Sequence, residues 1–407
     1  MKLVILTQYF PPEVGAPQNR LYELAVRLKN HGVEVTVLTA MPNYPSMEVH
    51  DGYKGKWYAN ETIEGIRVYR AWIFVSKSKS VVKRLMNYLS FVFTSFIVGF
   101  FKLPKHDFLL VESPPLFLGQ TAFLLSRLRG SKMIFNVSDL WPESAEKLGI
   151  ISNKKIIKAA TALEEFLYRR AFLITGQTQG ICANIQSRFP NKNVFWVPNG
   201  VDIAYYNADE ITSDFRKRNG FDSDQFIVLY AGIIGHAQGL EVILNAAELL
   251  KQHTRIQFVL VGSGPMKLEL MEYKQTKQLQ NVHFYDAVEK SKMPDIVAGA
   301  DIAVIPLKKL DLFLGAIPSK IFESLAMRKP ILLGVEGEAK SLFIDQAKAG
   351  VAFEPENHQA LSEAVLYMSH NPSICKEMGE NGLSFVSRHF TRDLIAEKLL
   401  MKLKNIH

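Results

Sequence analysis

Hydrophobic and polar positions along the chain predict strands and helices in regular succession. Residues 3–7 form an apolar run typical of a buried strand, and residues 19–30 have the spacing of an amphipathic helix that ends before Gly32. Residues 33–39 then form a second, β-branched strand. A strand, a helix and a strand joined by short turns indicate a parallel sheet, because the helix returns the chain to the edge where it began.

The same pattern continues through the first half of the chain. The expected strands are residues 66–71, 108–112, 132–137, 173–176 and 194–197, and the expected helices are residues 116–129, 156–170 and 180–189. We therefore predict a first doubly wound sheet of six or seven strands.

A second α/β series follows a turn-rich stretch at residues 198–202, Pro-Asn-Gly-Val-Asp, and a polar segment that we interpret as a linker. Its expected strands are residues 227–232, 257–262, 282–284, 302–305, 331–334 and 350–353, and its expected helices are residues 240–251, 265–277, 359–369, 372–388 and 392 to about 405. The fold class is thus α/β, with two doubly wound, Rossmann-like domains over residues 1–198 and 199–390. Such domains are expected to face a central cleft that binds a ligand at the carboxyl ends of the strands.

Composition agrees with a globular, intracellular protein. A chain of 407 residues exceeds one ordinary core. Cys182 and Cys375 are far apart and lack metal-ligand spacing, so we expect a reducing compartment and no disulfide framework. The first residues lack a basic segment followed by a long apolar one, so no signal peptide is expected. The net charge of +8 suggests an anionic partner without choosing among nucleic acid, lipid head groups and phosphorylated metabolites.

The positive charge is concentrated around an uncharged, aromatic-rich segment at residues 85–101. A transmembrane helix, a buried core helix and an interfacial helix are all compatible with such a segment. We favour the interfacial helix, because flanking cations and aromatic side chains suit an anionic membrane surface. The residues expected to contact the membrane or acceptor are Lys83, Arg84, Phe91, Phe93 and Phe96.

Residues 314–333 carry the clearest candidate site. Pro318 and Ser319 suit the start of a helix, and Ser319 could cap it. Free backbone N–H groups at such a start favour anions, and Lys320 adds a full charge there. Glu323 lies one helical turn further on and could accept hydrogen bonds from sugar hydroxyls. The alternative is an ordinary surface ion pair.

Glycine-rich turns occupy two further strand–helix junctions of the second domain. Gly235 belongs to a turn with three glycines that ends at Gly239, and Gly262 and Ser263 follow the next strand. Three such junctions on one sheet edge predict a phosphate-bearing ligand.

In the first domain, Gly15 and Ala16 allow close approach of a ligand, although plain connection of the strand to the helix is an alternative. Two prolines in that loop argue against a dinucleotide fingerprint. Asp139 and Glu143 follow a predicted strand and could project from its carboxyl end, or Asp139 could simply cap a helix. No His, Cys, Asp or Glu cluster has metal-site spacing, and no P-loop is present.

These residues resemble the GT-B-fold glycosyltransferases of family 4, close to a subgroup that includes transferases of N-acetyl-L-fucosamine. The resemblance spans nearly the whole chain and is carried by Thr7–Glu13, Pro42–Pro45 with Gly52-Tyr53, Ser113–Leu116, Asp139–Ser144, Pro198–Asp202, Ala237–Gly239 and Pro318–Glu323.

The resemblance implies roles for several residues. Glu323 matches a glutamate that holds the ribose, while its paired glutamate is replaced by Gly315. The family's two diphosphate-binding cations would fall at Ile233 and Gln238, which leaves Lys320 as the replacement cation. A loop that includes Val288 would contact the base. By the same comparison, Asp139 is the best candidate in the first domain for orienting the donor sugar or receiving the acceptor proton.

The resemblance implies transfer of a sugar from a nucleotide sugar with retention of anomeric configuration. We expect the donor to be a UDP-sugar, and we expect no metal and no further cofactor. The acceptor would be a polyprenyl-diphosphate-linked saccharide of capsule or O-antigen biosynthesis, and the sugar an N-acetylated deoxysugar. The protein would be cytoplasmic and peripheral on the inner face of the membrane, with no nucleic-acid partner, and the helix at residues 391–407 would pack on the first domain. The alternatives are a GT-B-type UDP-N-acetylglucosamine 2-epimerase and a non-catalytic protein that binds sugar nucleotides.

Overall fold

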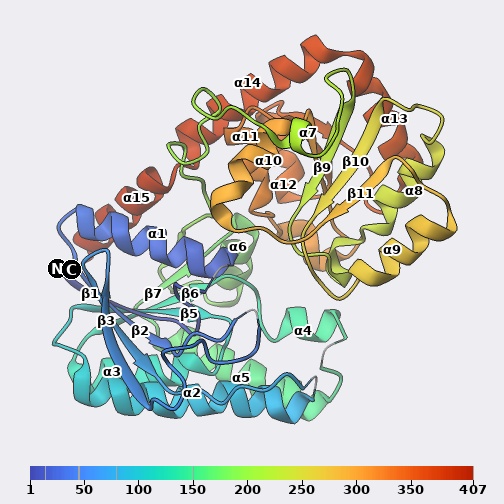
Figure 1. Cartoon of the computed structure of the whole chain (residues 1–407). Coiled ribbons are helices and arrows are strands. Elements are labelled where there is room, and N and C mark those ends of the chain that lie inside the picture. Colours follow the sequence, from blue (N-terminus) through green and yellow to red (C-terminus); the bar gives the residue numbers. More distant parts are fainter. Residues whose placement is uncertain (14, 45, 79, 150, 407) are drawn as a thin grey trace. The chain divides into compact units, whose positions relative to one another are not determined.

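The chain folds into two compact units in a computed structural model that describes residues 1–13, 15–44, 46–78, 80–149 and 151–406. The side chains of Ala16, Pro17 and Val81 are not described. Unit 1 consists of Met1–Pro198 and Arg392–His407, and unit 2 consists of Asn199–Thr391. Both units are α/β layers with a central sheet (Figure 1).

The sheet of unit 1 has eight strands in the order β3-β4-β2-β1-β5-β6-β7-β8. Its strands are β1 (Lys2–Leu6), β2 (Glu34–Ala40), β3 (Tyr58–Ile63), β4 (Ile66–Ala71), β5 (Phe108–Ser113), β6 (Lys132–Val137), β7 (Leu173–Gly176) and β8 (Val194–Trp196). All neighbours are parallel except β3 and β4, so the remaining strands end at one edge, which we term the carboxyl edge of unit 1.

The antiparallel strand β3 was not among the predicted elements. It pairs with β4 through a two-residue turn, Glu64-Gly65, whose φ angles are 48° and 73°. Two residues with positive φ form the tight hairpin turn that matches strand twist. The alternation of apolar and polar residues along β3 is weak, because this strand lies at the edge of the sheet and buries little apolar surface.

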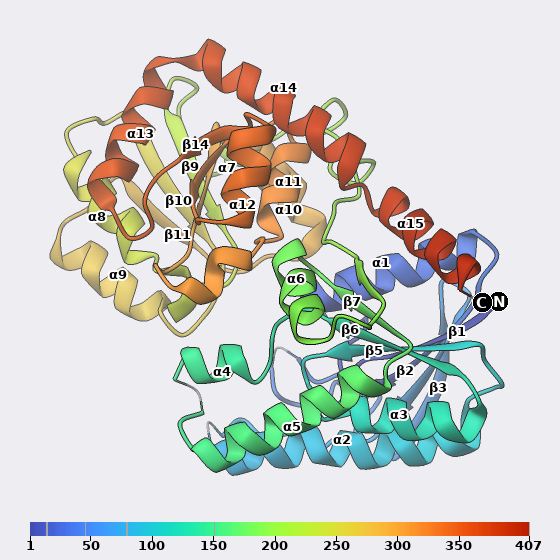
Figure 2. The ribbon, with the colours of Figure 1, turned by 180° about the vertical axis from the view of Figure 1, so that it is seen from behind.

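Helices cover both faces of this sheet (Figure 2). One face carries α1 and the C-terminal helix α15, which are joined by ion pairs between Arg27 and Asp393 and between Glu23 and Arg392. The other face carries α2, α3 and α5. The helices of unit 1 are α1 (Ala16–Asn30), α2 (Val81–Lys102), α3 (Leu118–Arg129), α4 (Glu143–Lys147), α5 (Lys154–Arg170), α6 (Gln179–Arg188) and α15 (Arg392–Asn405).

Helix α2 has one buried side and one exposed side. Phe91 is fully buried with Val98 in the core that α2 shares with the sheet, so the expectation that Phe91 contacts a membrane is wrong. Phe96 is only partly buried against the same core, whereas Phe93 is 62% exposed. Within the described residues, α2 is the one helix long and apolar enough to cross a membrane, by length and composition alone.

Unit 2 has a fully parallel sheet of six strands in the order β11-β10-β9-β12-β13-β14. Its strands are β9 (Phe226–Ala231), β10 (Ile256–Val261), β11 (Val282–Tyr285), β12 (Ile302–Pro306), β13 (Ile331–Gly334) and β14 (Gly350–Ala352). Its helices are α7 (Phe215–Arg218), η1 (His236–Gln238), α8 (Glu241–Leu249), α9 (Lys267–Thr276), η2 (Lys290–Lys292), α10 (Met293–Gly299), η3 (Asp311–Gly315), α11 (Lys320–Ala326), α12 (Glu338–Lys340), η4 (Ser341–Gln346), α13 (His358–His370) and α14 (Pro372–His389).

The segment predicted as a linker is folded onto unit 2. Val201 forms a β-bridge with Thr391 and donates its N–H to the Phe390 carbonyl at 3.0 Å. Further on, the Arg216 guanidinium of α7 pairs with Asp301 at 2.5 Å. The entry and exit of unit 2 are therefore held side by side within that unit.

Candidate functional site

The loops that follow β9 and β10 lie against each other at the carboxyl edge of unit 2. The Gly232 N–H donates to the Val261 carbonyl at 2.9 Å, and the Ile234 N–H donates to the Ser263 carbonyl at 2.9 Å. Gly262 has φ of 156°, and a Cβ there would lie 1.8 Å from the Gly232 carbonyl oxygen. Part of the glycine content that predicted a phosphate site is thus required by the contact between the two loops.

Lys320 points beneath these loops rather than into open solvent. Its Nζ lies 3.9 Å from the centroid of the Tyr230 ring, which favours a cation. A Cβ at Gly232 would lie 2.9 Å from Nζ, so a larger residue would displace this amine, and the φ of 144° there also favours glycine. The Tyr230 hydroxyl in turn donates to the Ile233 carbonyl at 2.5 Å and fixes the ring.

The surroundings of Lys320 disfavour a full charge on it. Burial lowers the pKa of Lys320 to about 7, against a smaller opposite effect of the Glu323 charge. Lys320 and Glu323 line one pocket with residues of β9 and β12, so the structure brings together the two residues that the sequence placed on one helical face. This pocket has a volume of about 10 Å³, too small for a sugar.

Helix α11 starts later than expected and is seven residues long, with Ser319 at its N-cap position. The Ser319 side chain makes no capping hydrogen bond, because the residue has helical backbone angles rather than the extended ones of a capping serine. Pro318 precedes it and, like Ser319, is partly exposed. The turn that begins α11 therefore remains open to a ligand on its outer side.

The other predicted donor contacts occupy the same edge of unit 2 but differ in exposure. Gln238 folds back toward buried Gly235, since a Cβ at Gly235 would lie 2.8 Å from the Gln238 side-chain oxygen. Ser263 is exposed in the loop after β10. Val288 is partly exposed in the loop after β11. These residues follow strands β9, β10 and β11, which are neighbours in the sheet.

Asp139 follows β6 at the carboxyl edge of unit 1, where the sequence predicted it. Desolvation of its carboxylate raises the pKa of Asp139 above its ordinary value, and the Glu143 charge adds to this effect. Hydrogen bonds from the Ser144 side chain and the Leu140 backbone oppose it in part. Glu143 begins the short helix α4 and pairs with Lys147 at 2.7 Å, so it is part of a surface ion pair.

A buried polar network lies directly beside Asp139, and sequence reasoning missed it. The Arg20 guanidinium pairs with Glu112 and donates to the Ser138 hydroxyl at 2.9 Å. The Asn136 side chain donates to the Glu112 carboxylate and accepts a hydrogen bond from the Thr175 hydroxyl at 2.6 Å. The network joins α1 to the ends of β5, β6 and β7 and so fixes the backbone that precedes Asp139.

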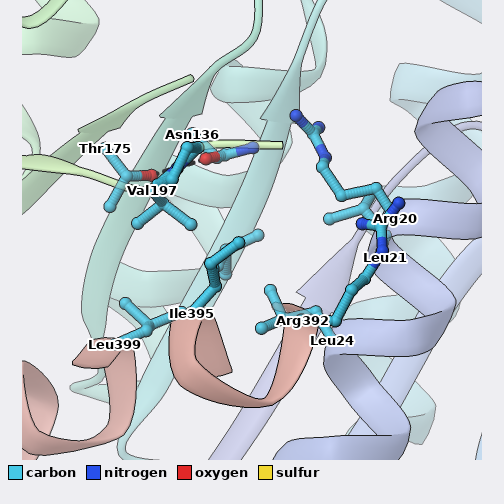
Figure 3. Close-up of a pocket in the computed structure, with 11 residues that line it drawn as sticks. Arg20, Leu21, Leu24, Asn136, Thr175, Val197, Arg392, Ile395 and Leu399 are labelled. Atoms are coloured by element: carbon cyan, nitrogen blue, oxygen red, sulfur yellow. Dashed lines mark hydrogen bonds between the residues drawn. The ribbon is translucent and has the colours of Figure 1, made fainter. Parts of the chain in front are cut away.

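Figure 3 shows a small cavity next to this network, bounded by α1, by strands of the sheet and by α15. Its polar lining residues are Arg20, Asn136, Thr175 and Arg392, and leucine, isoleucine, valine and proline residues form the rest. Its volume of about 20 Å³ suits a water molecule, not a sugar. We therefore assign it to the packing of α15 and not to a ligand.

A second buried group, Glu13, ties two loops together at the same edge of unit 1. Its carboxylate accepts hydrogen bonds from the N–H groups of Asn43 at 2.8 Å, Tyr44 at 2.9 Å and Phe10 at 3.1 Å. Burial raises the pKa of Glu13, while these hydrogen bonds lower it in part. The resemblance included these stretches, but only the fold reveals that they meet.

Gly15 and Ala16, the predicted donor contacts of unit 1, lie where the loop after β1 enters α1. A Cβ at Gly15 would lie 2.4 Å from the Gln18 side-chain oxygen, so a larger residue there would displace the end of that side chain. Ala16 begins α1, and its side chain lies outside the described part of the structure, as does Pro45 of the loop after β2.

Apolar side chains remain exposed on the outer side of α2 and on its neighbours. They are Val82, Leu85, Met86, Leu89, Phe93, Phe100 and Phe101 on α2, Leu124 and Leu128 on α3, and Ile156 on α5. We term this set the apolar helix face. Lys83 and Arg84 are exposed at the start of α2, and α2 and α3 contain no acidic residue.

Among the residues that the structure describes, no three His, Cys, Asp or Glu side chains are grouped so as to hold a metal ion.

Two family models match the chain, one for each unit. Residues 15–200 match the model of a glycosyl transferase 4-like domain, and residues 211–385 match that of glycosyl transferases group 1. Together they cover most of units 1 and 2.

The chain is also similar to named proteins over its whole length. It is 28% identical to a putative colanic acid biosynthesis glycosyl transferase, WcaI, of Escherichia coli K12, across 97% of this chain and 100% of that protein. A sucrose-phosphate synthase of Thermosynechococcus elongatus has the same fold, with a TM-score of 0.77, 14% identity, and coverage of 100% and 99%. The structure of Anabaena HepE with UDP and glucose has a TM-score of 0.73, 15% identity, and 99% coverage of both chains.

Proposed function

We propose that this chain, whose two units match a glycosyl transferase 4-like domain and a group 1 domain, is a GT-B glycosyltransferase that transfers a sugar from a UDP-sugar to a lipid-linked saccharide. The product would enter a bacterial surface polysaccharide, as the name of its colanic acid relative suggests. We propose a polyprenyl diphosphate as the lipid carrier and an N-acetylated deoxysugar such as N-acetyl-L-fucosamine as the transferred group.

The observation that carries this proposal is the grouping of Lys320 and Glu323 at the glycine-rich carboxyl edge of unit 2. A nucleoside diphosphate leaving group gains negative charge during transfer, and a fixed cation next to it stabilises that charge. Lys320 supplies this cation once its side chain turns outward past Gly232. Glu323 offers carboxylate oxygens to the hydroxyls of the ribose.

In unit 1, we propose that Asp139 orients the donor sugar or receives the proton of the acceptor hydroxyl. Its raised pKa brings the carboxyl closer to neutral pH, which suits a group that accepts a proton and later releases it. The Arg20–Glu112–Ser138 contacts hold the strand end that carries it. This part of the proposal assigns the acceptor to unit 1 and the donor to unit 2.

We further propose that the protein binds the cytoplasmic face of the membrane through the apolar helix face. Aromatic and aliphatic side chains on one side of a helix, with cations at its end, suit an anionic bilayer. The two most exposed phenylalanines of this face are Phe93 and Phe101, at 62% and 71%. A lipid-linked acceptor would then be reached at the surface where its carrier is embedded.

The proposal is tested with purified protein, a panel of UDP-, GDP- and TDP-sugars, and synthetic short-chain polyprenyl-diphosphate saccharides, with products read by mass spectrometry. We expect a product heavier by one sugar with a UDP-sugar, and we expect EDTA to leave its rate unchanged. Conversion of the nucleotide sugar without an acceptor would indicate an epimerase instead. Binding of UDP without turnover of any acceptor would favour a non-catalytic binding protein.

A further inference from the structure

Two tryptophans form a stacked pair at the edge of unit 1. The Trp57 and Trp72 ring centroids are 5.6 Å apart and their planes differ by 14°. Trp57 is 50% exposed, the most exposed of the four tryptophans in the chain. Trp72 stacks on one face of the Trp57 indole, and among the described residues no other aromatic ring stacks on Trp57. We term this pair the indole platform.

The platform is held rigidly. The Trp72 N–H donates to the Trp57 carbonyl at 3.0 Å, which extends the pairing of β3 with β4. The Trp72 carbonyl accepts a hydrogen bond from the Thr94 hydroxyl of α2 at 2.5 Å. Further along the same hairpin, Glu61 accepts a hydrogen bond from the Tyr53 hydroxyl at 2.8 Å, and the Arg70 guanidinium lies 5.2 Å from the Tyr53 ring centroid. A flat apolar surface is thus fixed in place next to hydrogen-bonding groups.

The platform lies at the carboxyl edge of unit 1. Trp72 directly follows β4, which is parallel to β2 and β1, and Asp139 follows β6 at the same edge. From β4 to β6 the sheet order runs through β2, β1 and β5, so four strand spacings of about 4.8 Å, or roughly 19 Å, separate the two places. A ligand that spans them is longer than one sugar.

We infer that the indole platform is a subsite for a pyranose ring of the acceptor saccharide, remote from the hydroxyl that reacts. Aromatic faces bind flat apolar surfaces, and the C–H face of a pyranose is such a surface, with hydroxyls around its rim. Tyr53 and Glu61 would meet those hydroxyls. The inference rests on the proposed function, because it takes the acceptor to be a saccharide bound by unit 1.

The competing explanation is that Trp57 is a membrane anchor, since tryptophan also prefers membrane interfaces. Polar groups on the same side of the hairpin favour the sugar. By strand register, Glu61 and Arg70 lie on the side that carries Trp57 and Trp72, and they are paired with each other, whereas the exposed residues of α2 and α3 form a separate, purely apolar and cationic set.

The test uses Trp57→Ala, Trp57→Phe and a control, Phe172→Ala. Phe172 is also an exposed aromatic of unit 1, at 39%, but it precedes β7 and therefore lies at the opposite edge of the sheet. Each protein is assayed with the water-soluble short-chain diphosphate saccharide that the wild type uses best, with its UDP-sugar, and with vesicles of phosphatidylglycerol and phosphatidylethanolamine. Tryptophan emission is also recorded while that saccharide is added without donor.

We expect Trp57→Ala to raise the KM for the saccharide about tenfold, with kcat, the KM for the UDP-sugar and vesicle binding unchanged. The saccharide KM of Trp57→Phe should lie between those of the wild type and Trp57→Ala, and that of Phe172→Ala should equal the wild-type value. The saccharide should change the emission of the wild type clearly more than that of Trp57→Ala, in which Trp141, two residues from Asp139, remains.

An unchanged saccharide KM together with unchanged emission would overturn the inference. So would weaker vesicle binding with an unchanged KM, which would make Trp57 a membrane anchor. If the wild type transfers no sugar, the proposed function fails, and the emission change alone then decides whether the platform binds saccharides.

Discussion

The ammonium of Lys320 lies over the Tyr230 ring and against Gly232, where a full charge is poorly hydrated. Burial disfavours the charged form at this position and lowers the pKa of Lys320 to about 7. A bound diphosphate would bring negative charges to the same place and favour the ammonium again. The protonation of this residue is therefore expected to depend on whether the donor is bound.

This linkage predicts proton uptake when UDP binds. At pH 8 the Lys320 amine of the free protein is mostly neutral, so the protein should take up close to one proton when UDP binds. The affinity for UDP should therefore fall as the pH rises from 8 to 10. Isothermal titration in two buffers with different ionisation enthalpies measures the uptake. Lys320→Met should bind UDP more weakly and take up no proton, while the exposed control Lys251→Met should behave as the wild type. Equal uptake in both variants would contradict the assignment.

The candidate residues in unit 2 could be predicted because the chemistry of Lys320, Glu323 and the glycine turns is local in the sequence. The partners of Asp139 could not. Arg20 lies 92 residues from Glu112, and nothing about an arginine on an amphipathic helix indicates that it is buried. The direction of the Lys320 side chain was also beyond the sequence, since it depends on the gap that Gly232 leaves after β9.

The buried Arg20–Glu112 pair should be important for stability. Both side chains are almost fully buried, at 6% and 4% exposure. Arg20→Met would leave the Glu112 carboxylate without its cation and should lower the free energy of unfolding by about 3–5 kcal/mol. The double variant Arg20→Met/Glu112→Gln should lose clearly less, because no uncompensated charge remains.

Urea unfolding of these variants measures the effect. The control is Arg169→Met, which breaks an exposed pair with Glu165 on α5 and should change stability by less than about 1 kcal/mol. Equal losses for Arg20→Met and Arg169→Met would show that the buried network is not what holds the end of β6.

At the scale of elements, the two sides of α2 have different roles. The inner side, with Phe91 and Val98, belongs to the core of unit 1, and the outer side carries exposed apolar residues. The sequence of residues 85–101 predicted a helix but could not divide its sides, because the polar residues Asn87, Thr94 and Ser95 are buried on the inner side, while apolar residues face outward. The core-helix alternative therefore describes the inner side of α2, and the interfacial-helix alternative describes its outer side.

This division predicts that two phenylalanines of one helix differ in effect. Phe91→Ala should lower the free energy of unfolding by about 3–5 kcal/mol, since it opens a cavity in the core. Phe93→Ser should leave stability nearly unchanged and reduce sedimentation with phosphatidylglycerol vesicles. Thermal unfolding and vesicle sedimentation separate the two effects. If Phe93→Ser bound vesicles as the wild type does, the apolar helix face would not be the membrane contact.

The doubly wound sheets themselves were predictable, because their strands are continuous apolar runs and their helices have clear spacing. The fold confirms two parallel-sheet α/β domains. The edge hairpin was missed for a physical reason: β3 buries little and depends on the Glu64-Gly65 turn more than on its own pattern. Edge strands are in general the least visible part of a sheet in sequence.

At the scale of the whole molecule, each unit contributes one half of the proposed reaction. By the proposal, Lys320 and Glu323 of unit 2 would bind the UDP-sugar, and Asp139, the indole platform and the apolar helix face of unit 1 would serve the lipid-linked saccharide. Transfer would then require groups of both units, whereas binding of UDP should require unit 2 alone. Loss of Lys320 should damage transfer more than loss of any other cation at the carboxyl edge of unit 2.

The most direct measurement is the rate of sugar transfer from the UDP-sugar to the short-chain polyprenyl-diphosphate saccharide by the wild type and Lys320→Ala, with Lys251→Ala as the control. We expect Lys320→Ala to lower kcat/KM by about 100-fold or more, because removing one preorganised group that stabilises developing charge has effects of this size. Lys251→Ala should retain full activity. A Lys320→Ala protein that is folded and transfers sugar at the wild-type rate would contradict the account.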